Sequence, residues 1–122
     1  MTPSTLQDFV LIDIDKAIHL MGDKEFIKEI FQLFTDNLTA YLAILKQHYQ
    51  ARNWSAIQAI AYKWRVEASY CGANRLGKVC QQLETLLQRR LFEEAEMYYQ
   101  SLLEAAVATK EAAKNAITAL IN

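Results

Sequence analysis

Apolar residues recur every three or four positions along most of the chain, which is the spacing of one face of an α-helix. The longest run follows Asp23 and reaches Tyr49, and it predicts a helix of about 27 residues with an unbroken apolar face. Its apolar positions are Ile27, Ile30, Phe31, Phe34, Leu38, Tyr41, Leu42, Leu45 and Tyr49. We expect this helix to bury that face against other helices along its whole length.

The next helix is predicted over residues 54–71, and its two sides differ in character. The side predicted to be buried carries Ile57, Ile60, Ala61, Trp64, Ala68 and Cys71. Tyr62, Val66 and Tyr70 follow one another at intervals of four on the opposite side, and Ala59 lies one turn earlier. We call these four residues the tyrosine stripe. We expect the stripe to face solvent or a partner.

Polar and glycine residues mark the ends of this helix and the start of another. Asn53 is suited to cap the helix over 54–71, and Gly72 is suited to end it. Asn74 can then cap a helix whose apolar positions are Leu76, Val79, Cys80, Leu83 and Leu87. Because the connecting turn is short, these two helices should be antiparallel neighbours.

A last helix is predicted from about Phe92 to near Asn122, with a stripe that Lys110 interrupts. The stripe consists of Phe92, Ala95, Tyr99, Leu102, Leu103, Ala106, Ala113, Ile117 and Leu120. Such a helix would be about 45 Å long, which exceeds the length of a helix of about 20 residues. The tail from Thr109 should therefore bend, pack on a short N-terminal helix, or extend beyond the bundle.

The N-terminal part of the chain predicts only short elements. Residues 1–12 suggest a non-helical or one-turn segment that packs onto the end of a bundle. Asp13 or Asp15 can cap a short helix that runs to about Met21, and Gly22 can end it in the left-handed conformation.

Together these patterns predict one all-α domain over residues 1–122. The expected fold is an antiparallel up-down four-helix bundle with a short extra N-terminal helix and no strand. Its core should include Phe31, Phe34, Leu38, Trp64, Leu83 and Tyr99.

Composition supports a helical protein and argues against two classes of partner. Hydrophobic residues are 52% of the chain, which has three glycines and one proline, too few for the turns of a β-protein. The net charge is −1, from 13 basic and 14 acidic residues, so no general attraction to nucleic acid is expected. With no apolar run of membrane-spanning length and no leader-like N-terminus, we expect a soluble cytoplasmic protein.

Motifs for catalysis and metal binding are missing from the sequence. It has no glycine-rich phosphate loop, no nucleophile elbow and no paired metal-ligand motif, so we expect neither an enzyme nor a cofactor. The spacing of Cys71 and Cys80 is not that of a metal site, and we interpret both as buried reduced thiols. His19 and His48 are interpreted as surface or boundary histidines.

The run AYKWRVEASYCGANRL, residues 61–76, resembles the signature helix of the histidine-containing phosphotransfer (HPt) domain, whose usual form begins Ala-His-x-Leu-Lys-Gly. Ala61, Trp64 and Arg65 stand for the alanine, leucine and lysine of that form. Gly72, Leu76 and Leu83-Glu84 match its later landmarks. The segment GDKEFIKEIFQLF also resembles the part that precedes the signature helix, so the resemblance runs from Asp15 to Glu84.

Two functional positions depart from the family pattern. Tyr62 occupies the position of the phosphate-accepting histidine, and Val66 occupies that of the glycine one turn later. The resemblance implies relay of a phosphoryl group between receiver-domain aspartates through an imidazole. A phenol of pKa about 10 does not form a labile phosphate, so we expect an HPt-like protein without a catalytic residue.

The resemblance also implies that the face around Tyr62 contacts a response-regulator receiver domain or a hybrid histidine kinase. The expected contact residues are Ala59, Tyr62, Lys63, Arg65, Val66, Ser69 and Tyr70. Lys63 and Arg65 either attract the acidic pocket of a receiver or are ordinary solvated charges. Two alternatives stay open: a homodimerising structural module that uses this face or the last helix, and phosphotransfer through His19 or His48.

Overall fold

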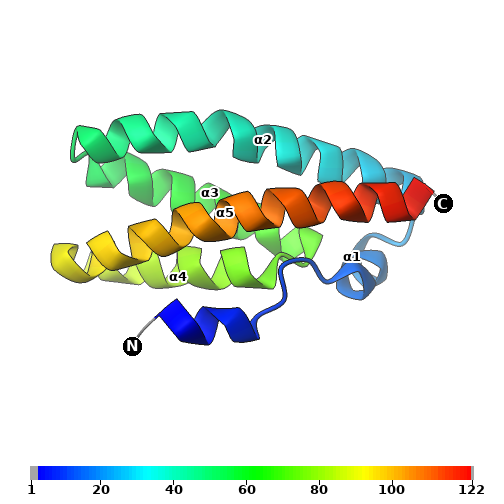
Figure 1. Ribbon diagram of the computed structural model, residues 1–122, viewed down its shortest axis with the longest axis horizontal. Coiled ribbons are helices and arrows are strands. Elements are labelled where there is room, and N and C mark those ends of the chain that lie inside the picture. Colours follow the sequence, from blue (N-terminus) through cyan, green and yellow to red (C-terminus); the bar gives the residue numbers. More distant parts are fainter. Residues whose placement is uncertain (1–2, 122) are drawn as a thin grey trace.

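The computed structural model describes residues 3–121, and the helices in that range account for almost all of them. The chain order is η1 (Pro3–Asp8, a 3-10 helix), α1 (Ile14–Met21), α2 (Lys24–Gln50), α3 (Trp54–Cys71), α4 (Asn74–Gln88) and α5 (Phe92–Ile121). Figure 1 shows the four long helices running up and down beside one another, with α1 at one end. No strand occurs within residues 3–121, and the predicted fold class is confirmed.

The long helices form a closed ring of neighbours. Helix α2 contacts α3 and α5, and α4 contacts the same two helices from the other side of the bundle. Each long helix therefore buries one face and exposes another. For α3, the exposed face lies between α2 and α4.

The bundle interior contains all six residues that were named as expected core residues. Trp64, Phe31, Leu38 and Leu83 have no exposed surface, and Tyr99 is also buried. The sixth predicted core residue, Phe34, is buried as well. At about 25 cal/mol per Å² of apolar surface removed from water, side chains of this size contribute about 1.5–3 kcal/mol each.

Side-chain caps begin three of the helices, and the caps of α1 and α3 lie at predicted positions. Asp13 accepts a hydrogen bond from the backbone N–H of Lys16 at 3.0 Å, which settles the choice between Asp13 and Asp15. Asp23 caps α2 and Asn53 caps α3 in the same manner.

The predicted cap of α4 is wrong. Ala73 occupies the cap position and supplies no side-chain hydrogen bond, while Asn74 is already helical. The N–H of Arg75 in the first turn instead donates to the carbonyl oxygen of Val10 at 3.0 Å. An N-terminal backbone group thus satisfies a donor that a cap residue would otherwise serve.

Gly72 joins the end of α3 to the start of α1. Its φ is +66°, the left-handed conformation that ends a helix, and its carbonyl oxygen accepts the N–H of Asp13 at 2.8 Å. A Cβ atom at this position would collide with the carbonyl oxygen of Asp13. Glycine is therefore required both for the turn and for the close approach of the two segments.

Helix α5 continues to Ile121, and its tail lies beside the N-terminal half of the long helix α2 (Figure 1). Ala113 and Ala116 in the tail are buried, so this part belongs to the bundle. A surface cavity between the tail and residues 10–14 shows that the two segments are neighbours. Phe92, predicted as the first residue of the buried stripe, is 40% exposed because it lies at the helix start.

Helix η1 lies along α4 and not at the end of the bundle, where the sequence pattern placed residues 1–12; residues 1 and 2 lie outside the described part of the chain. Leu6 is buried there, and Nε of Arg75 donates to the carbonyl oxygen of Phe9 at 2.9 Å. Backbone carbonyls of the N-terminal segment thus bind an arginine of α4. None of the described helices is long and apolar enough to cross a membrane.

Candidate functional site

The tyrosine stripe lies on the exposed side of α3, opposite the buried Trp64. Tyr62 is 56% exposed and Tyr70 is 54% exposed, which is high for large aromatic side chains. Ala59 is exposed and Val66 is half-buried. The four residues therefore lie on one side of α3, with Val66 one turn from each tyrosine along the helix.

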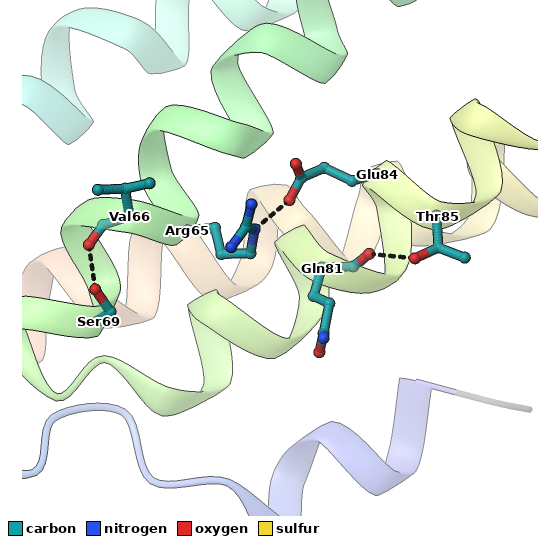
Figure 2. Close-up of polar contacts among 6 residues, drawn as sticks. All are labelled: Arg65, Val66, Ser69, Gln81, Glu84 and Thr85. Carbon is teal, nitrogen blue, oxygen red and sulfur yellow. Dashed lines mark hydrogen bonds and ion pairs between the residues drawn. The ribbon is translucent and has the colours of Figure 1, made fainter.

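Arg65 is bound to α4 through an ion pair. Its Nε atom lies 2.6 Å from Oε2 of Glu84, whose residue is 8% exposed (Figure 2). This hydrogen bond raises the pKa of Arg65 above its ordinary value, so the guanidinium stays charged. The same guanidinium lies 5.2 Å from the ring centroid of Tyr62. A charge thus borders the tyrosine ring on the α4 side.

Lys63 forms an ion pair within α3, on the side that faces α2. Its Nζ atom lies 3.6 Å from Oε2 of Glu67 and 5.3 Å from the ring centroid of Tyr41. The same carboxylate oxygen accepts a hydrogen bond from Nδ2 of Asn37 at 2.8 Å. Both cations that the sequence placed near Tyr62 are therefore paired with acidic side chains of the bundle.

Glu67 has one oxygen that is left without a partner. Its Oε1 atom is buried and makes no hydrogen bond with any described residue. A buried carboxylate oxygen without a donor costs about 1–3 kcal/mol. Glu67 is also one of the residues that line a small cavity between α2 and α3.

Ser69 is exposed, and its hydroxyl donates to the carbonyl oxygen of Val66 at 2.6 Å (Figure 2). This bond back to the helix is common for serine within helices. The hydroxyl oxygen can still accept a hydrogen bond from outside.

An apolar cavity of about 160 Å³ lies next to the stripe, between α2 and α3. Ile30, Leu33 and Tyr70 are among its lining residues, and Leu33 is 56% exposed. Phe26, two turns before Leu33 on the same side of α2, is 46% exposed. Sequence reasoning missed Leu33 and Phe26. Their spacing of seven, off the buried stripe of α2, was the available signal.

The two histidines lie outside α3, and the two cysteines are buried. His19 is in the last turn of α1 and His48 is in the last turn of α2. Cys71 and Cys80 are buried free thiols, as predicted, and burial raises the pKa of Cys71 to about 12. Across residues 3–121, no three His, Cys, Asp or Glu side chains are placed to hold a metal ion.

Comparison with known protein families gives one match, which covers most of the chain. The model of the Hpt domain family matches residues 29–121, from the first third of α2 to the end of α5. Searches of curated proteins and of solved structures found no match. The family match and the up-down bundle agree with the resemblance seen around Ala61. The chain therefore belongs to the Hpt domain family, whose members act in phosphorelay signalling.

Proposed function

We propose that this protein is an Hpt-fold docking module that does not carry phosphate. It would bind a receiver domain or a histidine kinase through the tyrosine stripe and so compete with, or recruit, other members of a phosphorelay. The proposal rests on the half-exposed phenol of Tyr62, which the sequence resemblance aligns with the family's histidine. This face would then bind a receiver domain or a kinase without transferring a phosphoryl group.

The chemistry of a phenol supports the loss of transfer. A relay needs a nucleophile whose phosphorylated form passes the group on at little free-energy cost, which a phosphoramidate of histidine does. A phenol is mostly protonated near neutral pH, and its phosphate ester is not a labile donor. Tyr62 would therefore end a relay at this position.

Val66 supports the same conclusion for steric reasons. It lies one helical turn from Tyr62 and is half-buried, in the position that matches the family's glycine. A branched side chain there occupies space through which an aspartate of a receiver would have to approach. Reactive atoms must come within about 3–3.5 Å of each other for transfer.

The composition of the face supports protein binding. Tyr62 and Tyr70 are exposed aromatic side chains, and the exposed Leu33 of α2 extends the surface beside the apolar cavity. Tyrosine is enriched among the residues that dominate binding energy in protein interfaces. Arg65 and Lys63 add charged borders on the two sides of the stripe.

A double substitution tests the docking proposal. Tyr62→Ser with Tyr70→Ser should abolish detectable binding to receiver or kinase domains of the same organism, because losing two interface aromatics commonly costs about 2 kcal/mol or more each. Met97→Ser with Val107→Ser is the matched control, since these α5 residues are similarly exposed at 52% and 54%. Biolayer interferometry against purified domains would measure both.

Two outcomes would contradict the proposal. Equal binding by both double variants would show that the stripe is not the contact surface. Loss of a homodimer in sedimentation, with receiver binding unchanged, would assign the stripe to self-association. Melting curves should agree among the proteins, because exposed substitutions change stability by about 0.5 kcal/mol or less.

A further inference from the structure

Another cavity, of about 380 Å³, lies on the opposite side of α3 from the apolar one. It opens where α1, α3 and α4 meet the N-terminal segment, and Lys16, Arg65 and Lys78 contribute to its lining. No carboxylate side chain is among the described residues that line it. We propose that this cavity binds a small phosphate-bearing ligand.

The two lysines are free to bind an anion. Neither Lys16 nor Lys78 makes an ion pair within 4.0 Å among the described residues, although the protein has 14 acidic residues. The Nζ atom of Lys16 has only the amide oxygen of Asn74, at 3.5 Å, and that of Lys78 lies 5.9 Å from the ring centroid of Phe9. Two ammonium groups from different helices thus border one cavity without a counter-charge of their own.

Arg65 supplies the third cation from α3. Its Nε atom is bonded to Glu84, while its two terminal nitrogens make no hydrogen bond with any described residue. Glu84 holds the guanidinium in place and offsets one of the three positive charges. Figure 2 shows the arginine between α3 and α4, with Gln81 of the cavity lining beside it. A guanidinium fixed in this manner is well suited to phosphate oxygens.

Neutral groups of the cavity fit the same ligand. The amide nitrogen of Asn74 is a free donor, because its oxygen is the atom that accepts from Lys16. The ring of Phe9, 36% exposed, forms an apolar wall. The start of α4 opens onto the cavity and adds partial positive charge.

The charge of the cavity is local and its size suits a small molecule. The chain has a net charge of −1, so three cations around one hollow do not reflect a generally basic protein. Small-molecule sites typically enclose about 300–1,000 Å³, and this cavity falls in that range. The site is separate from the tyrosine stripe, with Arg65 on the border between them.

Titration of the intact ¹⁵N-labelled protein with pyrophosphate and with ADP, each without metal, tests the proposal. We expect saturable shifts of the backbone amides of Asn74, Gly77 and Ser69, which line the cavity. Lys16→Gln with Lys78→Gln should weaken binding about tenfold or more, because two charge-assisted contacts are lost. The control, Lys46→Gln with Lys114→Gln, removes the same charge from exposed positions elsewhere and should change affinity by about twofold or less.

Binding by either probe with this variant pattern supports the site, and comparison of the two separates recognition of the phosphates from recognition of the nucleoside. The absence of saturable shifts with both probes would overturn the proposal. So would shifts confined to other parts of the molecule, or equal weakening in the two double variants. The spectra also report folding of each variant, and neither variant alters Tyr62 or Tyr70, so the docking proposal is tested independently.

Discussion

At the scale of single residues, we propose that Tyr62 and Val66 together prevent phosphotransfer at the exposed face of α3. Tyr62→His alone should give little phosphotransfer, because Val66 holds a receiver aspartate away from the imidazole. Adding Val66→Gly should raise the rate by about two orders of magnitude, the effect of removing a misplacement of about 1 Å. Rates of label transfer from a phosphorylated receiver would measure this.

Glycine within a helix costs about 1 kcal/mol, so Val66→Ala with Tyr62→His is a useful companion variant that keeps helix propensity. The transfer rate of this variant should lie between that of Tyr62→His alone and that of Tyr62→His with Val66→Gly. Equal rates with valine, alanine and glycine at position 66 would show that Val66 is no obstruction.

The ion pair between Arg65 and Glu84 also has its effect at the residue scale. Arg65→Gln should lower the free energy of unfolding by about 1 kcal/mol, because Glu84, 8% exposed, would lose its charged partner. The loss should be at the low end of values for buried pairs, since the arginine side chain is 40% exposed. Arg89→Gln, at an exposed position, is the control for urea unfolding. Equal losses in the two variants would assign no stability to the pair.

The two cysteines should be inert in the native protein. Burial raises the pKa of Cys71 to about 12 and raises that of Cys80 as well, so both thiols stay protonated in the folded state at pH 8.5. Alkylation by iodoacetamide should be at least about a hundredfold slower in the native protein than in urea. Rapid labelling of either residue without denaturant would contradict their burial. Because burial raises the pKa of Cys71 in the folded state, ionisation of this thiol favours the unfolded state. The free energy of unfolding should therefore fall as the pH rises from about 9 to 12.

At the scale of elements, Gly72 links α3 and α1. Gly72→Ala should destabilise the fold by about 2 kcal/mol or more, because alanine is strained at φ +66° and its Cβ would strike Asp13. Gly77→Ala is the control in α4, where the nearest atom would lie at 3.6 Å, an ordinary contact, and helix propensity favours alanine. The melting temperature should therefore fall for Gly72→Ala and rise for Gly77→Ala. A stable Gly72→Ala variant would show that the two segments are able to separate.

The helix pattern could be predicted from the sequence because each helix has a strong apolar period and most have a local start or stop signal. Asn53 and Gly72 are such signals, and each acts where it was expected. The cap of α4 could not be predicted, because Val10, far away in the sequence, binds the N–H of Arg75. Contacts between residues far apart in the sequence are not visible in its periodic pattern of apolar residues.

The candidate site could be predicted only in part for the same reason. The exposure of Tyr62 and Tyr70 follows from the phase of α3 alone. The partner of Arg65 depends on the register of α3 against α4, which the sequence pattern does not specify. Leu33 joins the surface only through the arrangement of α2 beside α3.

At the scale of the whole molecule, the bundle of an Hpt domain is intact, and Trp64 and Ala61 of α3 are buried in it. The two positions that depart from the resemblance, Tyr62 and Val66, are not among the buried residues of α3. Our proposal implies that fold stability and phosphotransfer are separable in this protein. We propose that the bundle is retained for the surface it presents.

Incubation with a phosphorylated receiver domain or an autophosphorylated hybrid kinase tests this account most directly. The protein should acquire no acid-labile phosphate, because Tyr62 offers a phenol where transfer needs an imidazole. An active Hpt domain in the same reaction is the positive control. Stoichiometric acid-labile label on this protein would contradict the account, and mapping of that label to His19 or His48 would identify a different phosphotransfer residue.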